Sequence, residues 1–432
     1  MGDAALAEVR TSGRRTAAKM LGVILVCLIT LDVVSAALGV FPPAYDFGIP
    51  NLGWAPEVKG VMWLDSCRDF EAGGRAKYIR NEIGIRTTLP VDTIRADHER
   101  FKIAVVGDSH TDLCAPNDST HPGVLDSTLH RLGMNSLVLS YGMGRYSPLQ
   151  AYLLYEKELV PFAPQALVLN LYTGNDFYDM MRPDDRPHFE PVPGGEYRVA
   201  APEWFVFDDP DQPRWMRQSR LLYLARSVGK ATGISSGLTR FRYLMATAAA
   251  QDAGWLDRIR ITSAYMQDLG KTFQPTLGYP AAFAAQMLNQ SLFFYHFPAS
   301  RAESQRRVRY LLKMIREQNP GLELVMSPIP SYQLAVGTSR DSVYDATIAK
   351  MPFTFEQARA EEQMLYDDLR TAATEEGWIF VDNLASLRAY GGPNRLYNGN
   401  DYHISRTASQ IIGEKEARAF MQARQDSAAA TR

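Results

Sequence analysis

Five short apolar runs recur along the chain, and segments with helical periodicity separate them. The runs are KIAVVGD from Lys102, NSLVLSYG from Asn135, QALVLNLYTG from Gln165, LELVMSPIP from Leu322 and GWIFVDN from Gly377. Runs rich in Val, Ile and Leu between helices are typical of parallel strands buried on both faces. They predict a five-stranded parallel sheet in a three-layer α/β/α domain of the doubly wound, flavodoxin-like type.

Amphipathic segments between these runs predict the covering helices. They are DSTLHRLG (126–133), PLQAYLLYEKEL (148–159) and ESQRRVRYLLKMIREQ (303–318). Residues 180–299 interrupt the alternation, so we expect the domain to comprise residues 99–179 and 300–425. The interruption contains the aromatic stretch TLGYPAAFAAQMLNQSLFFYHFP. It predicts either an insertion with its own small core or a cap that shapes the substrate cleft.

One apolar segment, MLGVILVCLITLDVVSAALGVF (20–41), is long enough to cross a bilayer, which takes about 20 residues. Four basic residues from Arg10 to Lys19 precede it, and basic residues remain on the cytoplasmic side. We therefore expect residues 1–19 in the cytoplasm, one transmembrane anchor in a bacterial inner membrane and the main domain in the periplasm or outside. A cleaved signal peptide is the alternative, and it exports the same domain.

Asp32 lies within the apolar segment, where a carboxylate is costly unless it approaches the interface or has a partner. It predicts either a position near the outer interface or contact with a partner membrane protein. Residues 42–98 are rich in turn residues and are expected to form a connector that packs on the main domain. Cys67 and Cys114 fall in the exported part, where a disulfide is permitted, but the sequence leaves their pairing open.

Composition excludes one class of partner. The net charge is −2 and no basic run occurs, whereas nucleic-acid binding usually requires a basic patch. We therefore expect no nucleic-acid partner.

Chemically useful residues follow four of the predicted strands. The first strand ends at GDSH, the second at SYGMGRYSPLQ, the third at YTGND, and NGNDYHIS follows the fifth. The carboxyl ends of parallel strands meet at one edge of the sheet, where ligands bind. Ester hydrolysis needs such a set: a hydroxyl nucleophile, an imidazole base, a carboxylate and donors for the oxyanion.

Two other interpretations of GDSH fail on composition. Asp108-x-His110 resembles the start of a metallophosphoesterase, but none of the 7 histidines follows Gly-Asn or forms His-x-His. A phosphate-binding turn would need further glycines, and Asp108 and Asp112 would repel the anion. We therefore expect no metal site and no phosphate-binding turn at this motif.

Together these motifs resemble the SGNH-hydrolase family, also called GDSL esterases. VVGDSHTD, YGMGRYSPLQ, YTGND and DYHIS are similar to its four blocks, and RNEIGIR and SPIPS resemble membrane-anchored bacterial members. The resemblance covers residues 81–179 and 303–413, and it implies a three-layer fold that hydrolyses or transfers acyl groups without a cofactor.

The resemblance also implies a role for each motif residue. Ser109 is the expected nucleophile, His403 the base, and Asp401 the carboxylate that orients the imidazole. The expected oxyanion donors are the backbone N–H of Ser109, a backbone N–H at Gly144 and the side-chain amide of Asn175.

His110, Arg145 and Asp176 are the candidate residues for lining the substrate. For His110 the alternatives are a structural role or a second base, and for Asp176 the alternatives are capping of the following helix or a part in the reaction. The sequence departs from the family pattern in two places. One residue, where the family usually has two, separates Asp401 from His403, and Arg145 stands where a glycine is usual.

The acyl chemistry that the resemblance implies predicts an acylated small molecule or glycan as the substrate. Location outside the cytoplasm favours an acetyl ester on an envelope or extracellular carbohydrate. The alternatives are a polysaccharide O-acetyltransferase, a lipid esterase and a non-catalytic envelope protein that binds a glycan or a partner.

Overall fold

The computed structural model describes residues 61–69, 74–182, 186–200, 243–249, 251, 253–272, 278–337, 342–390, 396–399 and 401–430, together with Thr30. The expected cytoplasmic segment and, apart from Thr30, the expected anchor therefore lie outside the described residues. None of the helices in the described part of the chain is both long and apolar enough to cross a membrane.

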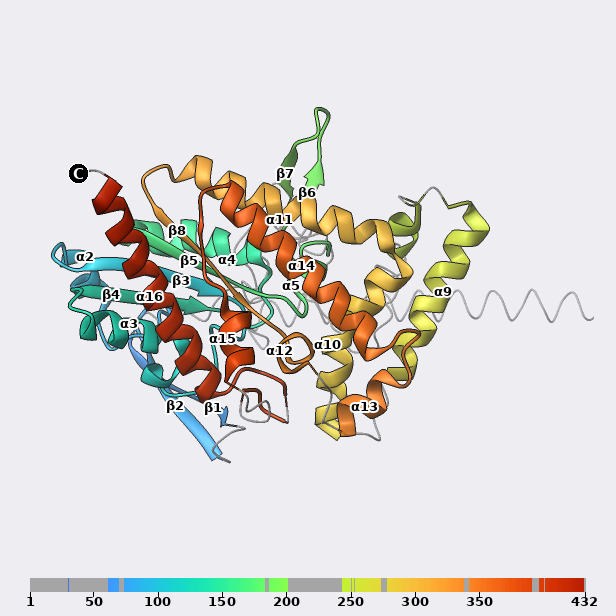
Figure 1. Cartoon of the computed structure of the whole chain (residues 1–432), viewed down its shortest axis with the longest axis horizontal. Helices are drawn as coiled ribbons and strands as arrows, with labels where there is room; N and C mark the ends of the chain where they lie inside the picture. The colour runs from blue at the N-terminus through green and yellow to red at the C-terminus, as the bar shows by residue number, and fades with distance from the viewer. Residues whose placement is uncertain are drawn as a thin grey trace, which may run out of the picture.

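Five parallel strands form the central sheet, as the apolar runs predicted (Figure 1). They are β3 (Phe101–Gly107), β4 (Ser136–Gly142), β5 (Ala166–Tyr172), β8 (Glu323–Ile329) and β9 (Ile379–Phe380). Their order is β4-β3-β5-β8-β9, which is the flavodoxin-like order. Since β4 and β5 flank β3 on either side, the loops after these three strands meet at one edge of the sheet.

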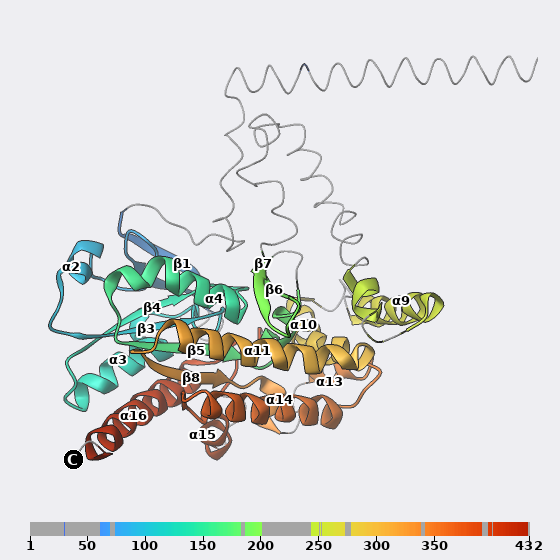
Figure 2. The same cartoon turned by 90° about the horizontal axis from the view of Figure 1, so that it is seen from above.

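Helices cover both faces of the sheet because successive strand residues point to opposite sides. One face, with Ile103 and Val105, packs under α3 (His121–Arg131) and α16 (Arg406–Ala430). The other face, with Ala104 and Val106, packs against α4 (Pro148–Leu154), α11 (Pro298–Gln318) and α14 (Phe355–Glu375). Figure 2 shows α16 and α4 on opposite sides of the strands.

Shorter elements connect these layers. They are α2 (Val91–Ala96), a 3-10 turn (Asn117–Ser119), a π turn (Tyr155–Leu159), a second 3-10 turn (Val160–Phe162), α5 (Asp176–Asp179), α12 (Tyr332–Val336), α13 (Ser342–Ile348) and α15 (Asn383–Ala389).

A buried carboxylate ties α16 to the middle of the sheet. Glu416 is 1% exposed, and its Oε1 accepts hydrogen bonds from Ser327 Oγ at 2.6 Å and Asn170 Nδ2 at 3.2 Å. Asn170 and Ser327 are direct neighbours on β5 and β8. The other carboxylate oxygen lies 3.3 Å from His121 Nδ1 on α3. This polar cluster therefore joins two strands and two helices.

The part of the expected connector that the structure describes packs on the loop after β3. It contains an antiparallel hairpin of β1 (Trp63–Asp69) and β2 (Gly74–Arg80), which the sequence analysis did not predict. Arg80 Nη2 lies 2.6 Å from Asp112 Oδ1, and Arg86 donates to Leu113 O at 2.5 Å. A disulfide joins Cys67 of β1 to Cys114, with 5.8 Å between their Cα atoms.

The described part of the insertion packs on the domain. It contains β6 (His188–Pro191), β7 (Tyr197–Ala200), α9 (Trp255–Thr272) and α10 (Gly278–His296). The side chains of Leu288, Leu292 and Phe293 belong to the same buried apolar cluster as one face of the sheet. The apolar side of α10 is therefore continuous with the main core, while a role as a cap stays a prediction.

Candidate active site

Two glycines allow the chain to turn sharply beyond the sheet. A Cβ on Gly107 would lie 2.3 Å from Thr111 Oγ1, and one on Gly142 would lie 2.5 Å from the backbone nitrogen of Asp112. Both distances are far below van der Waals contact, so only glycine fits where the turn after β3 folds back over the strand ends. This close approach places Ser109, two residues beyond Gly107, at the edge of the sheet.

Ser109, His403 and Asp401 lie in contact in a relay at this edge. His403 Nε2 lies 2.8 Å from Ser109 Oγ, and His403 Nδ1 lies 3.0 Å from Asp401 Oδ2. The two ring nitrogens thus face the hydroxyl and the carboxylate, the arrangement that lets an imidazole accept a serine proton. These are the three residues that the sequence analysis assigned to catalysis.

A tight turn makes the short spacing of Asp401 and His403 workable. Tyr402, between them, has a left-handed backbone with φ of 56°. Its N–H donates to Asn398 O at 2.9 Å, and Asn398 N–H donates to His403 O at the same distance. The backbone N–H of His403 also donates to Asp401 Oδ1 at 3.2 Å. The turn therefore brings the carboxylate back to the imidazole across a single residue.

Nearby carboxylates favour the charged form of the base. Burial disfavours the imidazolium, but the bonded Asp401 and the more distant Asp108 outweigh this effect and raise the pKa of His403. Burial also raises the pKa of Asp108 to about 6. Charge that develops on His403 during proton transfer is thus stabilised.

The turn after β4 places Gly144 beside Ser109. A Cβ built on Gly144 would lie 3.8 Å from Ser109 Cβ, so the backbone there is close to Ser109. A hydrogen bond of 3.1 Å from Tyr146 N to Met143 O closes the turn. Arg145, its third residue, has φ of 70° and is exposed. Positive φ at this position favours glycine, which explains physically why a glycine is usual where this chain has Arg145.

Asn175 lies just after β5 and is held by a buried ion pair. Its Nδ2 donates to Asp179 Oδ2 at 2.9 Å, and the same oxygen lies 2.8 Å from Arg186 Nη1. Asp179 and Arg186 are each only 4% exposed. The sequence analysis missed both residues, although the four-residue spacing of Asn175 and Asp179 would have suggested contact on a helix.

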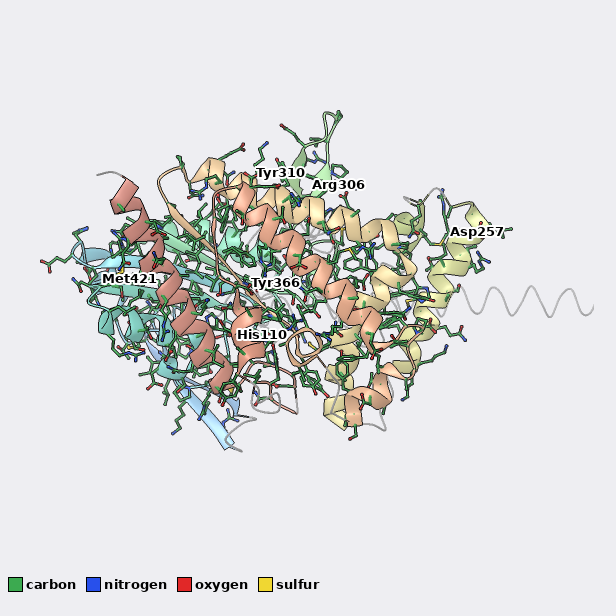
Figure 3. All side chains as sticks on the ribbon, viewed as in Figure 1. His110, Asp257, Arg306, Tyr310, Tyr366 and Met421 are labelled. Carbon is green, nitrogen blue, oxygen red and sulfur yellow. A yellow bond between two sulfur atoms is a disulfide. The ribbon has the colours of Figure 1, made fainter. Side chains whose placement is uncertain are left out.

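His110 packs behind the imidazole of His403. Its ring stacks on Tyr172 with 3.9 Å between centroids, and its centroid lies 4.7 Å from that of His403. Its Nδ1 accepts a hydrogen bond of 3.4 Å from Ile404 N. Burial, then the neighbouring His403, lowers the pKa of His110 well below its usual value. It lies in the interior of the molecule, whereas Asp257 of α9 lies at the periphery (Figure 3).

Asp176 is also buried, at 1% exposure. Its Oδ2 accepts a hydrogen bond of 2.7 Å from Tyr172 N. Burial, with Asp108 and Asp179 nearby, raises the pKa of Asp176 well above its usual value. The observed contacts of His110 and Asp176 are with the protein itself, and substrate contact by either residue or by Arg145 stays a prediction.

A metal ion would need several ligands from the described side chains. Within the ranges given above, no group of three or more His, Cys, Asp or Glu residues is arranged to hold one. The side chains of Ser109, His403 and Asp401 at the edge of the sheet are instead suited to proton transfer and hydrogen bonding.

Comparison with known proteins gives matches only among solved structures. No family profile and no curated protein matches the sequence. A GDSL-like lipase from Parabacteroides merdae is 12% identical, with a TM-score of 0.35, covering 75% of this chain and 98% of the lipase. LAE5, an α/β hydrolase from the metagenome of Lake Arreo, is 11% identical, with a TM-score of 0.34 and coverage of 74% and 94%.

Axe2, an acetylxylan esterase from Geobacillus stearothermophilus, is 11% identical, with a TM-score of 0.32 and coverage of 74% of this chain and 92% of the esterase. The chain is thus similar, at low identity, to solved hydrolases that include esterases and a GDSL-like lipase.

Proposed function

We propose that this protein is a serine esterase of the SGNH type. The observation that supports this most directly is the relay from Ser109 through His403 to Asp401, with distances of 2.8 and 3.0 Å. The flavodoxin-like strand order, with the relay beyond the carboxyl ends of the strands, is the second support.

In the proposed reaction His403 Nε2 accepts the hydroxyl proton of Ser109 while Ser109 Oγ attacks the acyl carbon of the substrate. The carbonyl oxygen becomes an oxyanion that accepts hydrogen bonds from the backbone N–H groups of Ser109 and Gly144 and from Asn175 Nδ2. Collapse breaks the ester bond, and His403 returns its proton to the departing alcohol. Water then attacks the acyl-serine through the same steps, releasing the carboxylic acid and restoring Ser109.

The substrate we propose is an acetyl ester on an envelope or extracellular carbohydrate. The support is the expected export of the domain, together with the Cys67–Cys114 disulfide, since disulfides persist mainly in oxidising compartments. We likewise propose anchoring in an inner membrane through residues 20–41, with Asp32 facing a partner membrane protein. Separating membranes from soluble periplasm tests the anchor, because a cleaved chain would be found in the soluble fraction.

Labelling of the full chain by a fluorophosphonate serine probe tests the proposed activity. We expect labelling of the wild type, loss of labelling in Ser109→Ala and normal labelling in Ser127→Ala, which alters a serine on α3 away from the relay. A folded wild type that remains unlabelled would contradict the proposal.

Chain-length preference tests the substrate class. Faster hydrolysis of p-nitrophenyl acetate than of longer esters would support the carbohydrate ester. Rates that rise with acyl length would favour a lipid substrate. Transfer of acetyl from p-nitrophenyl acetate to a glycan at the expense of hydrolysis would identify a transferase.

A further inference from the structure

One side chain of the insertion bridges the loop that carries Asn175. Gln290 of α10 donates from Nε2 to Thr173 O at 2.7 Å, and its Oε1 accepts from Tyr178 N at 3.1 Å. Thr173 and Tyr178 lie on either side of Asn175 in the sequence. Gln290 is 3% exposed, so water does not compete for these two bonds. The insertion thus holds both sides of this loop.

The bond to Tyr178 replaces one that Asn175 would ordinarily provide. Asn175 occupies the N-cap position of α5, where an asparagine side chain commonly accepts a hydrogen bond from the backbone N–H two or three residues later. The Asn175 side chain makes no such bond, and Tyr178 N–H, three residues later, donates to Gln290 instead. Capping of α5 is therefore supplied by α10.

The Asn175 carboxamide therefore does not cap the backbone at the start of α5. Its Nδ2 donates to Asp179 Oδ2 at 2.9 Å, while its buried Oδ1 has no hydrogen-bond partner among the described residues. An amide nitrogen carries two N–H donors, so one remains for a ligand after the bond to Asp179.

We propose that Gln290 is a positioning residue of the oxyanion site, which caps α5 so that Asn175 does not. The inference rests on the proposed esterase function. Replacement of Gln290 by an apolar residue takes away the acceptor Oε1 from the N–H of Tyr178, and Asn175 Oδ1 is the acceptor that the N-cap position provides. Rotation of Asn175 into that role would withdraw its amide from the oxyanion.

Two apolar replacements on the same helix test this role in the full chain. Gln290→Met removes the bridge. Asn289→Leu, the matched control, removes a bond of 2.9 Å from Tyr265 OH that lies within the insertion. On p-nitrophenyl acetate we expect Gln290→Met to lower kcat by about 10- to 100-fold with KM changed less than about threefold, below the roughly 10²–10³-fold typical of losing an oxyanion donor. Asn289→Leu should change kcat by less than about twofold, while it lowers Tm by about as much as Gln290→Met does.

A double mutant separates positioning from general loosening. Because Gln290 is proposed to act only through Asn175, Asn175→Ala with Gln290→Met should have the kcat of Asn175→Ala alone. Equal kcat losses in Gln290→Met and Asn289→Leu, a wild-type kcat in Gln290→Met, or additive losses in the double mutant would each overturn the inference.

Gln290→Glu keeps the proposal testable if the methionine variant does not fold. A carboxylate still accepts from Tyr178 N–H, so kcat should stay within about tenfold of wild type, and a loss as large as that of Asn175→Ala would overturn the inference. Failure of the esterase proposal is distinguishable, because it removes Ser109-dependent turnover and labelling from the wild type itself.

Discussion

Asp401 Oδ2 lies 3.0 Å from His403 Nδ1, although Tyr402 alone separates the two residues. The turn requires the left-handed backbone of Tyr402, a conformation that costs a bulky residue roughly 1–3 kcal/mol. The Tyr402 ring is fully buried and packs edge-on to Tyr332 and Tyr344. Aromatic packing below the site thus supports the orientation of the imidazole.

Replacement of Asp401 by Asn should remove most of the activity while the fold persists. The amide cannot stabilise the imidazolium, and it favours the wrong tautomer of His403. We expect kcat to fall by roughly 10³–10⁴-fold, as is typical when the orienting carboxylate of a serine triad becomes an amide. Steady-state kinetics measure this effect, with circular dichroism and Tm as the control. Retention of kcat within tenfold would show that another group orients His403.

On acidification, activity should begin to fall at a pH above about 6.5, the usual pKa of histidine. His403 accepts a proton only when neutral, and Asp401 and Asp108 raise its pKa, so protonation inactivates it earlier as the pH decreases. Asp108→Asn removes one negative charge, which lowers the pKa of His403 and moves the acid limb of kcat/KM to lower pH. An acid limb at the same pH or at a higher pH in Asp108→Asn would contradict the effect of Asp108 on the pKa of His403.

Arg145→Gly should stabilise the protein. Arg145 has φ of 70°, which costs an L-residue about 1–2 kcal/mol, whereas glycine adopts it freely. Glycine also lowers the free energy of unfolding by about 0.4–1 kcal/mol, because it raises the entropy of the unfolded chain. The net gain in the free energy of unfolding should therefore be about 0.5–1 kcal/mol. Urea unfolding measures the gain, and Arg145→Ala, which keeps the strain, serves as the control. Equal stability of the two variants would show that the turn is not strained by the side chain.

Removal of the disulfide should destabilise the fold substantially. Cys67 and Cys114 are 47 residues apart, and closing a loop of this size typically adds about 2–4 kcal/mol to the free energy of unfolding. Cys67→Ser with Cys114→Ser should lower the midpoint of denaturation, and a reductant should have the same effect on the wild type alone. A wild-type midpoint that reductant leaves unchanged would contradict the bond.

The strands and the catalytic motifs could be predicted because their signals are local. Each apolar run from Lys102 onward became a strand, and the motif residues Ser109, Asp401 and His403 meet at the edge of the sheet as the parallel arrangement implied. The β1–β2 hairpin was missed because turn residues dominate its surroundings, and β9 is only two residues long although its apolar run is longer.

The supporting residues could not be predicted because their partners are distant in the sequence. Gln290 contacts Thr173 across 117 positions, and nothing in its aromatic surroundings indicates a role beside Asn175. The charge of Arg186 likewise gives no sign that it pairs with Asp179 in the interior. Such contacts arise only when the core forms.

Glu416 has a consequence for the order in which the chain folds. Asn170 and Ser327 face each other on adjacent strands, and both depend on a carboxylate from a helix that follows all five strands. Until α16 docks, the Ser327 hydroxyl and the Asn170 amide lack this carboxylate as an acceptor, which weakens the centre of the sheet. A chain emerging from a ribosome or a translocation channel would therefore complete the hydrogen bonds at the centre of its sheet only once Glu416 is available.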